Sequence, residues 1–126
     1  MMRILLMLTG VSGFLSVALG AFGAHGLKQV LSPDMMAVFQ TGVHYQITHT
    51  LAALAALILF QLFENQKFLS AAKLYLFGIV LFSGSLYVMT LSGLRMLGMV
   101  TPVGGLLLLV AWAMLVLGAF QIKVDK

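Results

Sequence analysis

The chain has 126 residues, of which 62% are hydrophobic and only 8% are charged. Because soluble domains carry about 25% charged residues, these proportions exclude a water-soluble globular protein and indicate that lipid is the solvent of most side chains. The net charge of +4 is too thinly spread for a nucleic-acid surface, and the absence of cysteine excludes disulfides, thiolate metal sites and cysteine nucleophiles.

Four stretches of the sequence are long and apolar enough to cross a bilayer, for which a helix needs about 20 residues. They cover approximately residues 4–24, 43–63, 69–92 and 102–121. The sequence therefore predicts an all-α membrane protein in which residues 1–126 form one domain. We expect a bundle of four transmembrane helices with short loops and no separate soluble part.

The first stretch carries small residues at intervals of four: Ser12, Ser16, Gly20 and Ala24. Such a ridge lets a neighbouring helix approach closely in lipid, where no hydrophobic effect drives association, so we expect these residues to pack against another helix. Cleaved signal peptides contain apolar regions of only about 7–15 residues, and the longer run here favours an uncleaved span.

The second and fourth helices are predicted to start with the same capping pattern. SPD at 32–34 supplies an N-cap serine, a proline in the first turn and an acidic residue near the positive end of the helix dipole, and TP at 101–102 repeats the first two. A second helix that begins at Pro33 is longer than a membrane is thick. We therefore expect a protruding end, a bend near Gly42, or a short interfacial helix before the span.

Basic residues are unequally distributed between the two ends of the predicted bundle. With four spans, the N-terminus, the loop near residues 64–68 and the C-terminus share one side, which holds Arg3, Lys67, Lys73, Lys123 and Lys126. The other side holds only Lys28 and Arg95. Because Lys and Arg accumulate in cytoplasmic loops, we predict that both termini are cytoplasmic.

The three carboxylates, Asp34, Glu64 and Asp125, all fall at predicted span ends or beyond them. This excludes the mid-membrane carboxylate of an ion-coupled carrier and the paired carboxylates of many hydrolases. A serine–histidine nucleophile pair would lack its orienting carboxylate, so we expect no catalytic residue and no enzyme. His44 and His49 lie about 140° apart around a helix and cannot share an ion without a third helix, so we predict no metal site and no cofactor.

Polar residues of the second and third helices concentrate in the outer half of the predicted bundle. Those of FQTGVHYQITHT (39–50) mostly fall within an arc of about 180° on a helix, and SGSLYVMT (83–90) repeats hydroxyl side chains at helical spacing. Ionisable groups inside a membrane are costly and mark candidate functional sites. We predict one polar pocket at the outer mouth, formed by His25, Tyr45, His49, Ser83, Ser85, Tyr87, Arg95 and Thr101, with His44 and Gln46 as secondary members.

Two functions remain open from the residues alone. In the first, a non-enzymatic membrane protein uses this pocket to bind or pass a small solute, an ion or a lipid headgroup, with His49 as the central donor or proton acceptor. In the second, a structural or assembly protein uses the same side chains only to lock the helices together, while the ridge of the first helix docks a membrane partner or a second copy of the chain. A cavity beside His49 favours the first, whereas complete hydrogen bonding favours the second.

The sequence resembles the YgdD/YwdK-type family of small bacterial inner-membrane proteins, a domain of unknown function, in four successive motifs: GAFGAHGLK (20–28), FQTGVHYQITH (39–49), LFSGSLY (81–87) and GMVTPVGG (98–105). The resemblance extends over essentially the whole chain. It implies a four-span helical protein of the bacterial inner (plasma) membrane and implies no activity. The signature residues that it implies are Gly23, His25, Gly26, Tyr45, His49, Ser83, Gly84, Ser85, Tyr87, Thr101, Pro102 and Gly105.

Overall fold

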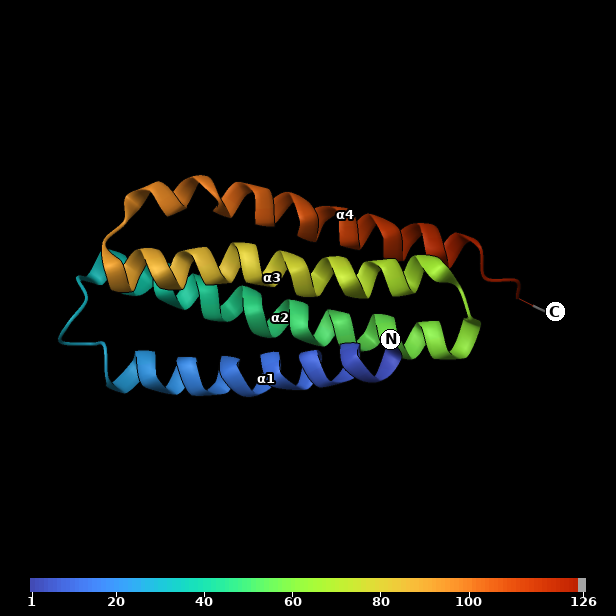
Figure 1. Ribbon diagram of the computed structural model, residues 1–126, viewed down its shortest axis with the longest axis horizontal. Helices are drawn as coiled ribbons and strands as arrows, with labels where there is room; N and C mark the ends of the chain where they lie inside the picture. Colours follow the sequence, from blue (N-terminus) through green and yellow to red (C-terminus); the bar gives the residue numbers. More distant parts are fainter. Residues whose placement is uncertain (125–126) are drawn as a thin grey trace.

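The computed structural model describes residues 1–124; Asp125 and Lys126, which contribute to the predicted charge distribution, lie outside the described residues. Four long helices follow one another along the chain, with one short 3₁₀-helix before the last (Figure 1). They are α1 (Met2–His25), α2 (Pro33–Phe63), α3 (Gln66–Ser92), η1 (Arg95–Met99) and α4 (Thr101–Phe120). All four long helices have the length and composition to cross a membrane, which confirms the predicted fold class.

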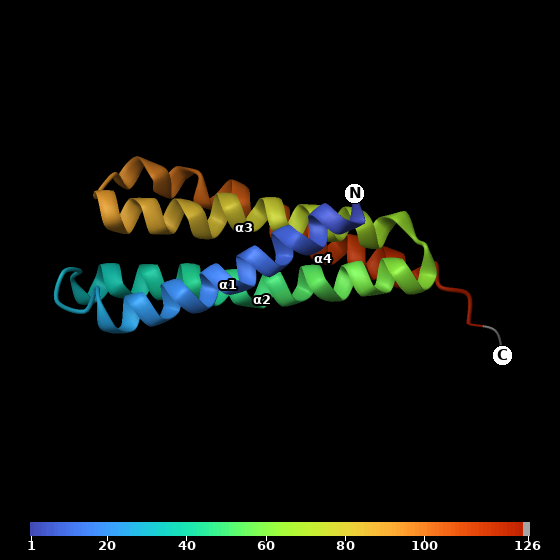
Figure 2. The ribbon, with the colours of Figure 1, turned by 60° about the horizontal axis from the view of Figure 1, so that its bottom comes forward.

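The helices α2 and α3 form a central antiparallel pair that α1 and α4 flank. Helix α1 packs chiefly against α2 and meets α3 at few points, whereas α4 packs along α3. Figures 1 and 2 show that the start of α1 and the end of α4 lie toward the end of the bundle where α2 turns into α3. This arrangement leaves α1 and α3 apart over much of their length.

Helix α2 has 31 residues and is therefore about 46 Å long at about 1.5 Å per residue. The side chain of Ser32 caps it as predicted, accepting a hydrogen bond from the backbone N–H of Met35 at 3.2 Å. No separate interfacial helix precedes the span, because residues 33–42 are the first turns of α2 itself. Phe39, which is fully buried, packs against the ring of Tyr87 and holds this segment to the bundle.

The predicted cap at the start of α4 is wrong. Helix α4 begins at Thr101, its N-cap is Val100, and no side chain caps it. The hydroxyl of Thr101 lies 2.6 Å from that of Ser85 instead. The side chain thus joins α4 to α3 rather than ending the helix.

The small-residue face of α1 packs against α2 but ends differently from the predicted ridge. Ser16 is buried, and a Cβ added to Gly20 would lie 3.3 Å from the side chain of Val43. Ala24, however, is exposed. Gly23 makes the contact in its place, because a Cβ on Gly23 would overlap the ring of Phe39. The α-helical repeat of about 3.6 residues, rather than four, shifts the packed face of α1 from position 24 to position 23.

Glycine allows the closest approach of two helices, between α3 and α4. A Cβ on Gly104 would collide with the backbone N of Phe82 and lie 2.8 Å from the carbonyl carbon of Leu81. On the facing helix, a Cβ on Gly78 would lie 2.7 Å from the side chain of Leu108. Backbone contact of this kind replaces the hydrophobic effect as the source of helix association in lipid.

The connection between α2 and α3 consists of Glu64 and Asn65 alone. Glu64 adopts a left-handed φ of 51° that ends α2. Asn65 accepts a hydrogen bond from the backbone N–H of Lys67 at 2.9 Å and so caps α3. Its amide also donates to the side chain of Gln121 at 3.1 Å, which ties this turn to the end of α4.

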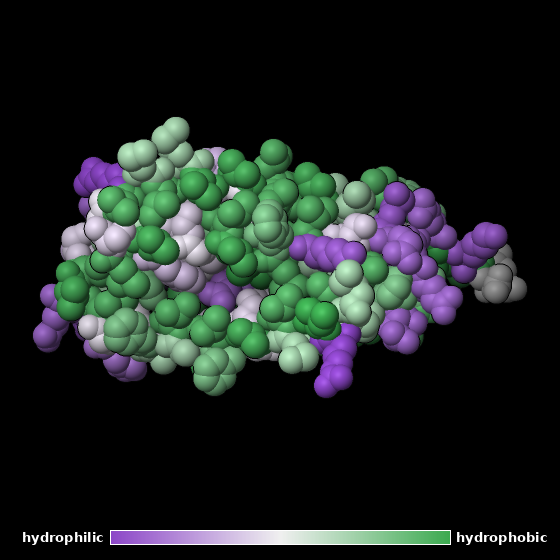
Figure 3. All heavy atoms as spheres, viewed as in Figure 1, coloured by the Kyte–Doolittle hydropathy of each residue, from purple (hydrophilic) through white to green (hydrophobic). Residues whose placement is uncertain are grey.

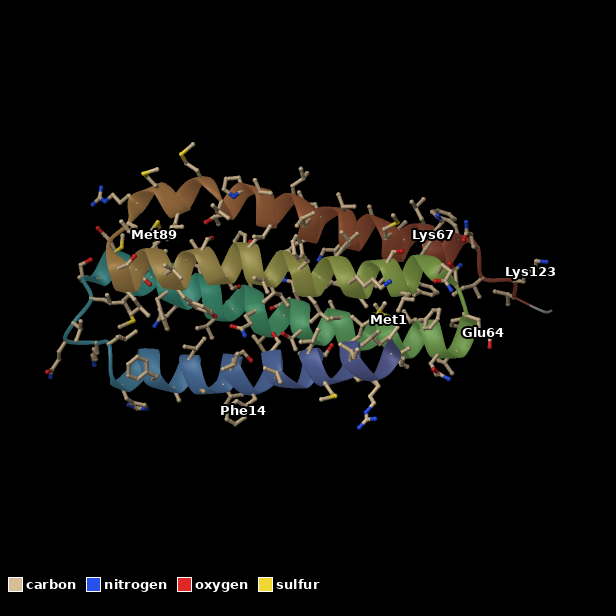
Figure 4. The ribbon with its side chains drawn as sticks, viewed as in Figure 1. Met1, Phe14, Glu64, Lys67, Met89 and Lys123 are labelled. Carbon is tan, nitrogen blue, oxygen red and sulfur yellow. The ribbon has the colours of Figure 1, made fainter. Side chains whose placement is uncertain are left out.

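The outer surface of the bundle is suited to lipid. Hydrophobic residues cover the middle of the face seen in Figure 3, and hydrophilic residues gather mainly at the ends. Phe14, which is 75% exposed, points away from the bundle (Figure 4). Glu64, Lys67 and Lys123 lie together at the end that holds the termini (Figure 4).

Replacing Gly104 with alanine is expected to destabilise the protein by about 1–3 kcal/mol, the usual effect of overpacking, because the new methyl group meets backbone atoms of α3. Gly105→Ala is the matched control, since its Cβ would lie 3.6 Å from the flexible ring of Phe82. Thermal unfolding of the two variants in detergent measures the difference. Equal stability of both variants would contradict the close contact.

Candidate functional site

A chain of hydrogen bonds links α1, α2 and α3 near the middle of the bundle. The hydroxyl of Tyr87 donates to Oε1 of Gln46 at 2.6 Å, and Nε2 of Gln46 donates to the backbone carbonyl of Ser12 at 3.0 Å. The hydroxyls of Ser12 and Thr50 lie 2.7 Å apart. Each buried polar group in this chain therefore has a partner, as stable interhelical contacts in lipid require.

The hydroxyls of Ser83 and Ser85 join α3 to the neighbouring helices. Ser83 is fully buried and donates to the backbone carbonyl of Gly42 at 2.7 Å, which joins α3 to α2. Ser85 contacts Thr101 as described, and its hydroxyl also lies 2.8 Å from the backbone carbonyl of Phe82. These side chains hold neighbouring helices together by hydrogen bonds.

His49 lies near the middle of α2 and faces α3 and α4 within a group of aromatic rings. Its imidazole stacks on Tyr45 at a centroid distance of 5.5 Å and lies 6.0 Å from the Trp112 ring and 5.9 Å from the Tyr75 ring. Nδ1 lies 2.7 Å from the backbone carbonyl of Tyr45. The other ring nitrogen, Nε2, has no hydrogen-bond partner among residues 1–124, although the residue is only 7% exposed.

Tyr75 is the second residue here with an unused polar group. It is completely buried, and its hydroxyl is the one buried side-chain N or O atom within residues 1–124 that has no hydrogen-bond partner. Its ring packs edge-on against Trp112 at 5.2 Å. It is therefore a core residue.

A groove of about 440 Å³ opens beside His49 between α2, α3 and α4. Its walls are mostly apolar, and α4 supplies most of them. The lining residues are Tyr45, His49, Phe82, Pro102, Gly105, Leu106, Leu108, Leu109 and Trp112. The volume lies within the range of about 300–1,000 Å³ of small-molecule sites.

The remaining predicted pocket residues do not line the His49 groove. His25 ends α1, His44 lies on α2, Arg95 starts η1, and all three are exposed. No hydrogen bond joins their side chains to other residues within the described part of the chain. The structure therefore divides the predicted pocket into a saturated network, a His49 groove and three exposed side chains.

Sequence reasoning missed several partners of these residues. It assigned Ser12 to packing only and did not use Thr50, although hydroxyl pairing across helices is common in lipid. It did not use Tyr75 or Trp112, because nothing in one sequence places them beside His49. No group of three His, Cys, Asp or Glu side chains within residues 1–124 is arranged to hold a metal ion.

The fold and the site define a small multi-pass integral membrane protein whose polar groups lie inside a four-helix core with lipid-facing grooves. A family model described as "Protein of unknown function (DUF423)" matches residues 19–105, and the chain belongs to this family. The resemblance inferred from the four motifs is thereby confirmed.

Relatives match the chain over nearly its whole length. The UPF0382 inner membrane protein YgdD of Escherichia coli K12 is 44% identical over 121 residues, which cover 96% of this chain and 92% of the relative. A UPF0382 membrane protein of Haemophilus influenzae is 42% identical over 118 residues, 94% of each chain. The UPF0382 membrane protein YwdK of Bacillus subtilis is 36% identical over 121 residues, 95% of this chain and 98% of the relative. No solved structure matches.

Replacing Tyr87 with phenylalanine is expected to lower the stability of the protein by about 0.5–1.7 kcal/mol, the range for interhelical hydrogen bonds in lipid, because Oε1 of Gln46 loses its donor. Tyr45→Phe is the control, since the Tyr45 hydroxyl has no hydrogen bond within the described residues. Denaturant titration in detergent compares the two. A loss no greater in Tyr87→Phe than in Tyr45→Phe would show that the bond adds nothing.

Proposed function

We propose that this protein is a non-enzymatic binding protein of the bilayer that takes a small lipid-soluble molecule with a hydroxyl donor into the His49 groove. The single observation that carries the proposal is the unpaired Nε2 of a nearly buried histidine that lines the groove. Nε2 is accessible from the groove rather than buried, and a polar atom that faces apolar surroundings without a hydrogen-bond partner is costly. A ligand that supplies the missing hydrogen bond removes that cost.

The hydrogen bond on the other ring nitrogen defines the kind of ligand. A carbonyl oxygen only accepts, so Nδ1 of His49 carries the proton that points at the carbonyl of Tyr45. In the neutral imidazole Nε2 is then an acceptor, and it pairs with a donor such as a hydroxyl group. The rings of Tyr45 and Trp112 and the aliphatic side chains of α4 favour an apolar body on that ligand.

The surroundings of the groove support entry from the lipid rather than from water. His49 is 16 residues from the start of α2, about 24 Å along a helix of about 46 Å, so it lies near mid-membrane. The polar side chains nearby are bonded to one another, and they supply no hydrophilic path. A ligand dissolved in the bilayer reaches such a site directly.

A second candidate function is supported by the saturated network around Gln46. Side chains that only lock helices are expected to be fully paired, and those of Ser12, Gln46, Thr50 and Tyr87 are. This favours a structural or assembly role for these four residues. It does not account for Nε2 of His49, which is why we prefer the binding function.

We further propose that the protein lies in the bacterial inner membrane with both termini in the cytoplasm. The termini share one end of the bundle (Figure 1), and Arg3, Lys67 and Lys123 lie in the segments at that end. Lys28 and Arg95 lie in the opposite connections. The excess of basic residues favours the cytoplasm for the first end.

A fluorescent protein fused after Val124 is expected to mature and fluoresce, because the proposed topology places the fusion in the cytoplasm, where such reporters fold. An alkaline phosphatase fused at the same place is expected to be inactive. Fusions after Gln29, in the α1–α2 connection, are expected to give the opposite pair of results. Active phosphatase at the C-terminus would reverse the proposed topology.

Binding to the His49 groove is measured with bromohexanol and its methyl ether, which differ in the hydroxyl donor. Trp112 is the one tryptophan of the chain and lines the groove, so bromine bound there quenches its fluorescence. One hydrogen bond of about 1 kcal/mol predicts about fivefold tighter binding of the alcohol than of the ether.

His49→Phe is expected to abolish this preference while it keeps an aromatic ring in the core. His44→Phe, an exposed histidine of the same helix, is the matched control and is expected to retain it. Equal quenching of the wild-type protein by both compounds, or a preference that survives in His49→Phe, would refute the proposed function and leave the locking role.

A further inference from the structure

A second groove, of about 510 Å³, separates α1 from α3 on the other side of the bundle. Apolar side chains of both helices form its walls, among them Leu8, Leu15 and Phe77. Figure 2 shows α1 crossing the α2–α3 pair at an angle. The groove shares no lining residue with that of His49.

The floor of this groove presents no unsatisfied polar group to a ligand. It includes Ser12, Gln46, Ser83 and Tyr87. Their side chains are engaged in the hydrogen bonds that link the three helices. A polar solute therefore gains no hydrogen bond here, whereas an alkyl chain gains contact with the apolar walls.

A lysine lies at the end of the groove that is nearest the termini. Lys73 is seven residues from the start of α3, about 10 Å along its axis, and it lines the groove beside Leu5 and Leu76. Its four-carbon stem allows the ammonium group to extend to the membrane interface. Arg3, in the first turn of α1, lies at the same end of the bundle.

Neither carboxylate within residues 1–124 is placed to neutralise Lys73. Asp34 starts α2 at the opposite end, and Glu64 follows the last residue of α2. The Glu64 side chain lies at the tip of the α2–α3 turn (Figure 4). A cation within a transmembrane helix is costly without an anionic partner, and in the bilayer the phosphate of a lipid provides one.

We propose that this groove binds one anionic phospholipid of the leaflet nearest the termini, with its phosphate at Lys73 and an acyl chain between α1 and α3. From Lys73 to Tyr87 the groove extends over 14 residues of α3, or about 21 Å. One leaflet of the hydrocarbon core is about 15 Å deep, so the groove accommodates the length of a chain. This site is separate from the one under the proposed function.

The test is native mass spectrometry of the full-length protein released from detergent with equal amounts of phosphatidylglycerol and phosphatidylcholine that carry identical acyl chains. An anionic lipid at one lysine predicts about a fivefold excess of bound phosphatidylglycerol. Lys73→Gln is expected to reduce this excess to near unity. Lys67→Gln, in the first turn of the same helix and outside the groove, is the matched control and is expected to keep it.

Gly84→Leu tests the acyl-chain part of the site independently. A Cβ on Gly84 meets nothing within 4 Å, and the residue lines the groove, so a leucine there fills the space without distorting the helices. We expect the variant to lose both lipids while its unfolding temperature stays close to that of the wild type. This loss distinguishes a lipid in the groove from one held only by surface charge.

Three results would overturn the inference. One is an unchanged preference in Lys73→Gln, and another is an equal loss in Lys67→Gln, which would indicate general charge attraction. The third is full lipid binding by Gly84→Leu, or a dimer that appears as lipid is removed, which would assign the groove to a second copy of the chain. None of these outcomes bears on the His49 groove, whose test uses Trp112 fluorescence.

Discussion

The hydrogen-bond chain from Tyr87 through Gln46 to Ser12 is the constraint on which the rest of the structure depends. Helix α1 has few contacts with α3, and in lipid no hydrophobic effect presses it against its neighbours. Gln46 bonds to both of these helices at once, at 2.6 Å and 3.0 Å. It therefore fixes α1 at a position where it packs on α2 and still leaves a groove beside α3.

Helix α2 presents polar side chains to two different sets of neighbours, because Gln46 and His49 are three residues apart. At about 100° per residue they are separated by about 60° around α2, enough for one to face α1 and α3 and the other to face the aromatic rings and α4. The polar groups on the first side are saturated, whereas Nε2 of His49 is not. Gln46 thus holds the helices together, whereas His49 is available to the proposed ligand, so that different residues serve the two roles.

The sequence predicts the four helices, the Ser32 cap and the polar character of the second and third helices, since these follow from hydropathy and local capping. It does not predict how those helices rotate against one another. The placement of Tyr75 and Trp112 around His49, and the backbone contact at Gly104, depend on packing between α3 and α4. His25 and Arg95 looked like pocket residues because they are polar and lie at the same end, but nothing in the sequence tests whether a helix end turns inward.

The two grooves also differ in when they come into existence during synthesis. The groove beside α1 needs only the first three helices, all of which precede residue 93. Most of the wall beside His49 comes from α4, which follows these three helices in the chain. A nascent chain can therefore complete the groove between α1 and α3 before α4 forms the His49 groove on the other side of the bundle.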